Sequence, residues 1–69
     1  MTDNTYKVTE IVGTSPDGVD QAIRNAIAKA SASLHGLDWF EVKEVRGLIA
    51  DGGVAHVQVM LKVGFKLNR

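Results

Sequence analysis

The sequence predicts an α+β fold of the type β-α-β-β, with a three-stranded antiparallel sheet of order 1-3-2 wrapped around one helix. Three features lead to this fold. A β-rich segment opens the chain, an Ala-rich amphipathic segment follows, and a glycine-containing turn joins two long segments with alternating character. Residues 1–69 are expected to form one domain, because so short a chain has room for a single core.

The first strand is expected from Thr5 to Gly13, a stretch rich in Tyr, Val, Thr and Ile. Tyr6, Val8 and Val12 share one side of its pleat. Glu10 interrupts that side with a charge. We therefore expect a largely apolar strand face that carries a single carboxylate.

The helix is expected to begin at Thr14-Ser15-Pro16-Asp17, where the Ser hydroxyl can accept free amides of the first turn and Pro fits a position without N–H. It is expected to end at Gly36, just after His35, in a left-handed conformation. Small residues in its apolar stripe allow close approach of the sheet. The stripe, with steps of three and four residues, comprises Val19, Ala22, Ile23, Ala26, Ile27, Ala30 and Leu34.

A hairpin should follow, with a second strand from Asp38 to Ala50 and a tight turn at Asp51-Gly52-Gly53. The returning strand alternates most cleanly, so it belongs in the centre of the sheet. Its helix-facing side comprises Ala55, Val57, Val59, Leu61, Val63, Phe65 and Leu67. Its other side comprises His56, Gln58, Met60, Lys62 and Lys66.

The second strand breaks the alternation after Lys43. Phe40 and Val42 share one side, but Val45 and Ile49 change parity, which indicates either a bulge or a strand that outruns its helix. Each arm of the hairpin, about 13 residues, exceeds the usual ~5 to 6. We therefore expect the hairpin to project into neighbouring subunits.

Composition favours self-association and excludes several partners. The 69 residues include no cysteine, yet 45% are hydrophobic, more than one small core readily buries. Lys plus Arg and Asp plus Glu number 8 each, so the sequence lacks the excess of basic residues with which proteins bind the phosphates of nucleic acid. Because long apolar runs and a signal-peptide pattern are absent from the sequence, we expect no membrane partner and a cytoplasmic location.

Two residues on the sheet face away from the helix could bind a ligand. Trp39 is the only tryptophan, and it is an interface anchor, a platform for a planar ligand or a simply exposed side chain. Gln58 is either solvated or pairs its amide with the edge of a heterocycle. The two can converge on one planar ligand if their strands are paired.

Other polar residues have ordinary explanations. His35 suits a helix C-terminus and His56 a surface position, and two distant His without Cys make a weak metal site. The hydroxyls of Thr14 and Ser15 fit helix capping better than nucleophilic catalysis, because no base lies near them in sequence. No catalytic residue is therefore predicted.

Several short runs resemble the bacterial dodecins over nearly the whole chain. They are Glu10-Ile11-Val12-Gly13-Thr14-Ser15, Leu37-Asp38-Trp39-Phe40-Glu41-Val42, Arg46-Gly47, Val57-Gln58-Val59 and Val63-Gly64-Phe65. The resemblance implies a hollow homododecamer that stores and buffers flavin and quenches its photochemistry without being an enzyme. FMN is the implied ligand, with riboflavin or FAD as alternatives and coenzyme A as an additional one.

The resemblance also implies roles for single residues. Trp39 would sandwich the isoalloxazine ring, Gln58 would hydrogen-bond its polar edge, and Arg46 would lie near the flavin unless it forms a surface ion pair. Lys66 stands where some relatives have Arg, which alters any phosphate or coenzyme A contact. Two other functions remain open: a structural homo-oligomeric module without a ligand, and an enzyme that uses flavin as a redox cofactor.

Overall fold

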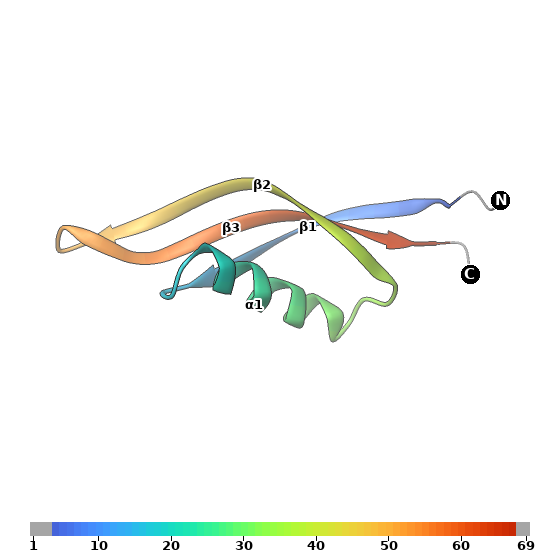
Figure 1. Cartoon of the computed structure of the whole chain (residues 1–69), viewed down its shortest axis with the longest axis horizontal. Helices are drawn as coiled ribbons and strands as arrows, with labels where there is room; N and C mark the ends of the chain where they lie inside the picture. Colours follow the sequence, from blue (N-terminus) through green and yellow to red (C-terminus); the bar gives the residue numbers. More distant parts are fainter. Residues whose placement is uncertain (1–3, 68–69) are drawn as a thin grey trace.

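The computed structural model describes residues 4–67 and confirms the predicted topology. The three strands form one sheet in the order β1-β3-β2, and both outer strands run antiparallel to β3 (Figure 1). The elements are β1 (Tyr6–Ser15), α1 (Val19–Ser31), β2 (Leu37–Ala50) and β3 (Gly53–Lys66).

The core lies between α1 and the two strands β1 and β3. The middle of the alternating apolar side of β3 is buried against small residues of the helix, as the sequence predicts. The predicted position of Leu67 on that side is wrong, because Leu67 lies beyond the end of β3 and is 53% exposed. Close approach depends on Gly13 of β1, where an added Cβ would overlap the Ala22 carbonyl and lie 2.7 Å from the Ala26 Cβ. The buried hydrophobic side chains are Ala22, Ala26, Ala30, Val59, Leu61 and Val63.

Both predicted helix ends are wrong. The helix begins at Val19 with Gly18 as its N-cap, and no side chain caps it. Ser15 is instead the buried last residue of β1, and its hydroxyl accepts a hydrogen bond of 2.9 Å from the Asp17 N–H. The Ser hydroxyl thus stabilises the turn before the helix, because the strand continues two residues further than predicted.

The helix ends at Ser31, five residues before Gly36. Gly36 does adopt a positive φ of 78°, but its carbonyl accepts a bond of 3.1 Å from the Lys66 N–H and so joins the start of β2 to β3. His35 therefore lies in the connecting loop, four residues beyond the last residue of the helix.

The hairpin turn is confirmed. Asp51 and Gly52 both adopt positive φ angles of 52° and 75°, as the favoured two-residue hairpin turns require. Both explanations for the broken alternation apply: the register shifts between Val42 and Glu44, and the hairpin extends well beyond the helix (Figure 1). The shift turns Val45 back to the helix side of the sheet.

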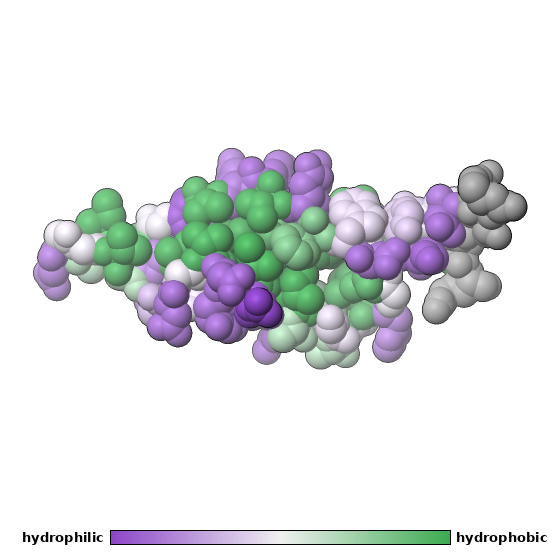
Figure 2. All heavy atoms as spheres, in the orientation of Figure 1, coloured by the Kyte–Doolittle hydropathy of each residue, from purple (hydrophilic) through white to green (hydrophobic). Residues whose placement is uncertain are grey.

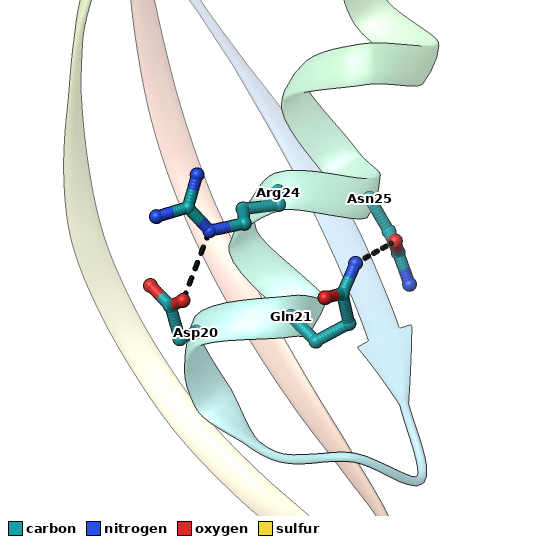
Figure 3. Close-up of polar contacts among 4 residues, drawn as sticks. All are labelled: Asp20, Gln21, Arg24 and Asn25. Atoms are coloured by element: carbon teal, nitrogen blue, oxygen red, sulfur yellow. Dashed lines mark hydrogen bonds and ion pairs between the residues drawn. The ribbon is translucent and has the colours of Figure 1, made fainter.

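The solvent side of α1 carries polar pairs at helical spacing (Figure 3). Arg24 forms an ion pair of 2.9 Å with Asp20, and the Gln21 amide donates a bond of 2.8 Å to Asn25. Such exposed pairs contribute little to stability. Within residues 4–67, no helix has the length and apolar character needed to span a membrane.

Candidate functional site

The candidate site residues lie on the sheet face turned away from α1, which we call the open face. Its membership follows from the strand register, because directly paired residues point to the same side. Strand β1 contributes Tyr6, Val8, Glu10, Val12 and Thr14. Strand β2 contributes Trp39, Glu41, Glu44, Arg46 and Leu48. Strand β3 contributes His56, Gln58, Met60, Lys62, Gly64 and Lys66.

Trp39 forms a platform at one end of the open face. It pairs with Gly64 of the central strand, and an added Cβ at Gly64 would overlap three atoms of the indole. The indole therefore lies directly over the backbone of β3. Its side chain remains 40% exposed, so part of the ring system is free to contact a further group.

Tyr6 contacts this platform from the opposite outer strand. Its ring meets the Trp39 ring edge-on, with centroids 5.9 Å apart and an interplanar angle of 62°. The Tyr6 hydroxyl donates a hydrogen bond of 2.8 Å to the Asp38 carboxylate, at the register shift between Leu37 and Trp39. This hydrogen bond, together with desolvation, raises the pKa of Tyr6 above its usual value. The phenol therefore stays protonated and able to donate.

A row of charges crosses the middle of the open face. Lys62 of β3 pairs with Glu10 on one side and with Glu41 on the other. Lys43, left unpaired by the bulge, reaches over the central strand to Glu10 at 2.8 Å. The hydrogen bond between them lowers the pKa of Glu10 and raises that of Lys43. The row separates the aromatic end of the open face from its other end.

Gln58 and Arg46 lie together at the other end. They are direct partners in the pairing of β2 with β3, and Thr14 flanks Gln58 from β1. The Arg46 guanidinium lies 3.8 Å from the Glu44 carboxylate, and both side chains are more than half exposed. The surface ion pair considered for Arg46 therefore forms, but it is loose enough to leave donors available.

The register keeps Trp39 and Gln58 apart within one chain. The predicted pairing of their strands is confirmed, but Trp39 pairs with Gly64, six positions along β3 from Gln58. At about 3.3 Å per residue, the separation is ~20 Å, more than the length of an isoalloxazine ring. This backbone separation favours a shared site in which Trp39 and Gln58 come from different subunits.

Trp39 lines a small hollow of about 120 Å³ with Leu37 and Asp38, and two larger grooves flank α1. One groove, of about 640 Å³, runs between α1 and β1, and the other, of about 400 Å³, lies between α1 and Phe40. Neither is lined by Trp39, Gln58 or Arg46. The predicted site residues therefore lie outside both grooves.

Strand β2 leaves apolar side chains bare on its helix side as well. Phe40, Val42 and Val45 are 48%, 43% and 52% exposed, because α1 packs on β1 and β3 instead. At the hairpin, Ile49 and Val54 are 81% and 70% exposed. Figure 2 shows apolar side chains continuing from the middle of the molecule out to the hairpin. So much bare apolar surface is typical of a chain that packs against other chains.

The histidines belong to no cluster of potential metal ligands within the described part of the chain. His35 and His56 are both exposed, and His35 lies in the loop before β2 whereas His56 lies in β3. Residues 4–67 contain no group of three or more His, Cys, Asp or Glu side chains that could hold a metal ion.

Sequence reasoning missed Tyr6, Asp38 and Gly64 as parts of the aromatic end. Gly64 left a usable signal, since a glycine inside a regular strand often marks a close approach of another group. No sequence pattern indicates the contact between Tyr6 and Asp38, because the two residues are 32 positions apart and belong to strands that do not pair.

Comparisons with known proteins agree on one family. A family model described as dodecin matches residues 5–68. The chain is 55% identical to the dodecin of Thermus thermophilus over 63 residues, which is 91% of each chain. It superposes on the structure of dodecin from Streptomyces coelicolor with a TM-score of 0.92 at 65% identity, covering 100% of this chain and 99% of that one.

A more distant relative has the same fold. The crystal structure of a calcium dodecin from Mycobacterium tuberculosis, described as having a novel calcium-binding site, matches with a TM-score of 0.79. Identity is 31%, with 93% of this chain and 91% of that chain covered. The similarity therefore extends over almost the whole chain in every case.

Proposed function

This chain belongs to the dodecin family, and we propose that it forms a hollow homododecamer that binds FMN between Trp39 side chains and suppresses the photochemistry of the flavin. The observation that carries the proposal is the Trp39 platform. A large indole lies over Gly64 on an uncovered sheet face and keeps 40% of its surface exposed. A planar aromatic ligand stacks favourably on such a ring.

The polar edge of the flavin would be bound by another subunit. The Gln58 amide carries both donors and an acceptor, which suits the alternating donors and acceptors of the isoalloxazine edge. Arg46 lies directly opposite Gln58 and adds positive charge for an anionic group such as the FMN phosphate. Because Trp39 and Gln58 are ~20 Å apart in one chain, the indole and the amide that contact one flavin come from different copies.

Assembly would use the apolar surface that the single chain leaves bare. Several apolar side chains of β2 and of the projecting hairpin remain exposed in the described part of the chain. Packing them against other copies removes apolar area from water at about 25 cal/mol per Å². The hairpin can reach a neighbour because it extends beyond the helix (Figure 1).

The role we propose is storage and protection of flavin without turnover. When bound, flavin supplies light absorption and accepts an electron from a nearby donor. The Trp39 indole is an electron donor at stacking distance, so excitation would be lost without fluorescence.

Titration of purified protein with FMN tests the proposal, with riboflavin and FAD as comparisons. We expect flavin fluorescence to fall to a small fraction on binding, and native mass to correspond to twelve chains. A colourless assembly that leaves FMN fluorescence unchanged would instead support a structural module without a ligand. Steady flavin-dependent oxidation of a nicotinamide would support an enzyme.

A mixing experiment tests whether one site combines two copies. Trp39→Ala and Gln58→Ala chains are each expected to assemble but to bind FMN weakly. After unfolding and refolding together, some sites combine an intact Trp39 with an intact Gln58 from different chains, so part of the strong quenching should return. If mixed assemblies bind no better than either variant alone, the shared site is wrong. Refolded wild-type protein is the control.

A further inference from the structure

Two side-chain bridges join strands that share no backbone pairing. Strands β1 and β2 are the outer strands of the sheet, yet Tyr6 bonds to Asp38 and Glu10 bonds to Lys43, each at 2.8 Å, across the central strand. The Tyr6 ring of the first bridge contacts the Trp39 platform. This bridge therefore lies beside the tryptophan on which the proposed ligand binding depends.

We propose that Tyr6 is a positioning residue that fixes the plane of the Trp39 indole before a ligand arrives. The Asp38 carboxylate holds the Tyr6 hydroxyl, so the phenol ring cannot swing away from the sheet. The edge of that ring then limits rotation of the indole, which the backbone at Gly64 already supports from below. Three neighbours therefore define one orientation for a side chain that is 40% exposed.

The physical benefit is preorganisation. An exposed indole without lateral support populates several rotamers, and binding then has to immobilise it. Asp38 is adjacent to Trp39 in sequence, so the hydrogen bond also ties the backbone of this part of β2 to β1. Releasing Tyr6 should therefore weaken stacking without removing any group that contacts the ligand.

The consequence for flavin rests on the proposed function, but the positioning itself does not. Immobilising one side chain corresponds to about two- to tenfold in affinity, so we expect loss of the bridge to weaken FMN binding by that factor. The fluorescence of the flavin that still binds should also be less completely quenched, because the mobile indole samples positions farther from the isoalloxazine ring.

The first experiment needs no flavin. Because Trp39 is the only tryptophan, its fluorescence anisotropy and near-ultraviolet circular dichroism report this indole alone. We expect Tyr6→Phe, which keeps the ring but not the hydroxyl, to lower both signals. Tyr6→Leu, which removes the ring, should lower them further, and Asp38→Ala should match Tyr6→Phe. The double variant Tyr6→Phe, Asp38→Ala should be no worse than either single variant, because both remove one interaction.

Glu10→Gln is the matched control. It weakens a bridge of the same length between the same two strands, but at a residue paired with Lys62, whereas Trp39 pairs with Gly64. Tryptophan signals that fall equally in Glu10→Gln would mean that the bridges only stabilise the sheet. Unchanged signals in Tyr6→Leu would also overturn the proposal.

A second measurement separates this inference from the proposed function. If wild-type protein binds no FMN, the flavin proposal fails, while the tryptophan signals still decide whether Tyr6 positions Trp39. If wild-type binds FMN and Tyr6→Phe binds it equally well despite a mobile indole, the link between positioning and affinity is wrong.

Discussion

Replacing Gly64 by Ala tests the geometry of the Trp39 platform most directly. The new methyl group would overlap three atoms of the indole, whereas the backbone of β3 is held on both sides by pairing with β1 and β2. The indole is the movable partner, because it is the far end of an exposed side chain. We therefore expect the fold to survive and the indole to leave its position over the central strand.

The magnitude follows from what the displaced indole can no longer do. Stacking of a heterocyclic base on an aromatic side chain is worth about 1–3 kcal/mol, which corresponds to an affinity ratio of about 5- to 150-fold. If the indole could not move, the overlap would instead cost about 1–3 kcal/mol of folding stability. Flavin affinity and thermal stability therefore report the two outcomes separately.

The assay is a fluorescence titration with FMN, accompanied by near-ultraviolet circular dichroism and thermal unfolding. Gly53→Ala is the matched control in the same strand, since an added Cβ there meets nothing closer than 3.8 Å. We expect Gly53→Ala to bind FMN normally. Wild-type affinity and quenching in Gly64→Ala, with an unchanged tryptophan spectrum, would refute the placement of the indole over β3.

Three further outcomes are expected. Trp39→Ala should bind FMN about 5- to 150-fold more weakly and restore flavin fluorescence, while native mass shows that the assembly is retained; loss of assembly with intact quenching would contradict the stacking role. Leu61→Ala leaves a cavity at a fully buried position and should lower the free energy of unfolding by about 2–5 kcal/mol. Denaturant unfolding at fixed protein concentration measures this change, and a decrease below about 1 kcal/mol would contradict the core position of Leu61. The lowered pKa of Glu10 means that its pairing with Lys43 stabilises the fold above the usual value of 4.5 and that this stabilisation is lost as pH falls through the lowered value. Wild-type and Glu10→Gln melting temperatures should therefore differ at pH 7 and converge at pH 2 to 3; a difference that persists in acid would exclude the ion pair as its cause.

Local rules were sufficient for the topology. One local pattern specifies each element: the strict alternation specifies β3, the Ala stripe specifies α1, and Asp51-Gly52 specifies the hairpin turn. Because connections between elements are short and crossovers are right-handed, few topologies can join these elements. The helix ends were beyond these rules. The Ser15 hydroxyl could cap a helix, but Ser15 pairs with Val57 of β3 and is therefore the last residue of strand β1.

By itself, the sequence determined the order of the strands, the side of the sheet that α1 covers, and the identity of Trp39 and Gln58 as residues of the open face. Only the tertiary structure decided how far apart those residues lie, because register depends on bulges such as the one at Lys43, and parity alone locates a bulge only approximately. The contacts of Tyr6 with Asp38 and Trp39 were likewise decided by folding, since they join outer strands that come together only when β3 pairs with both.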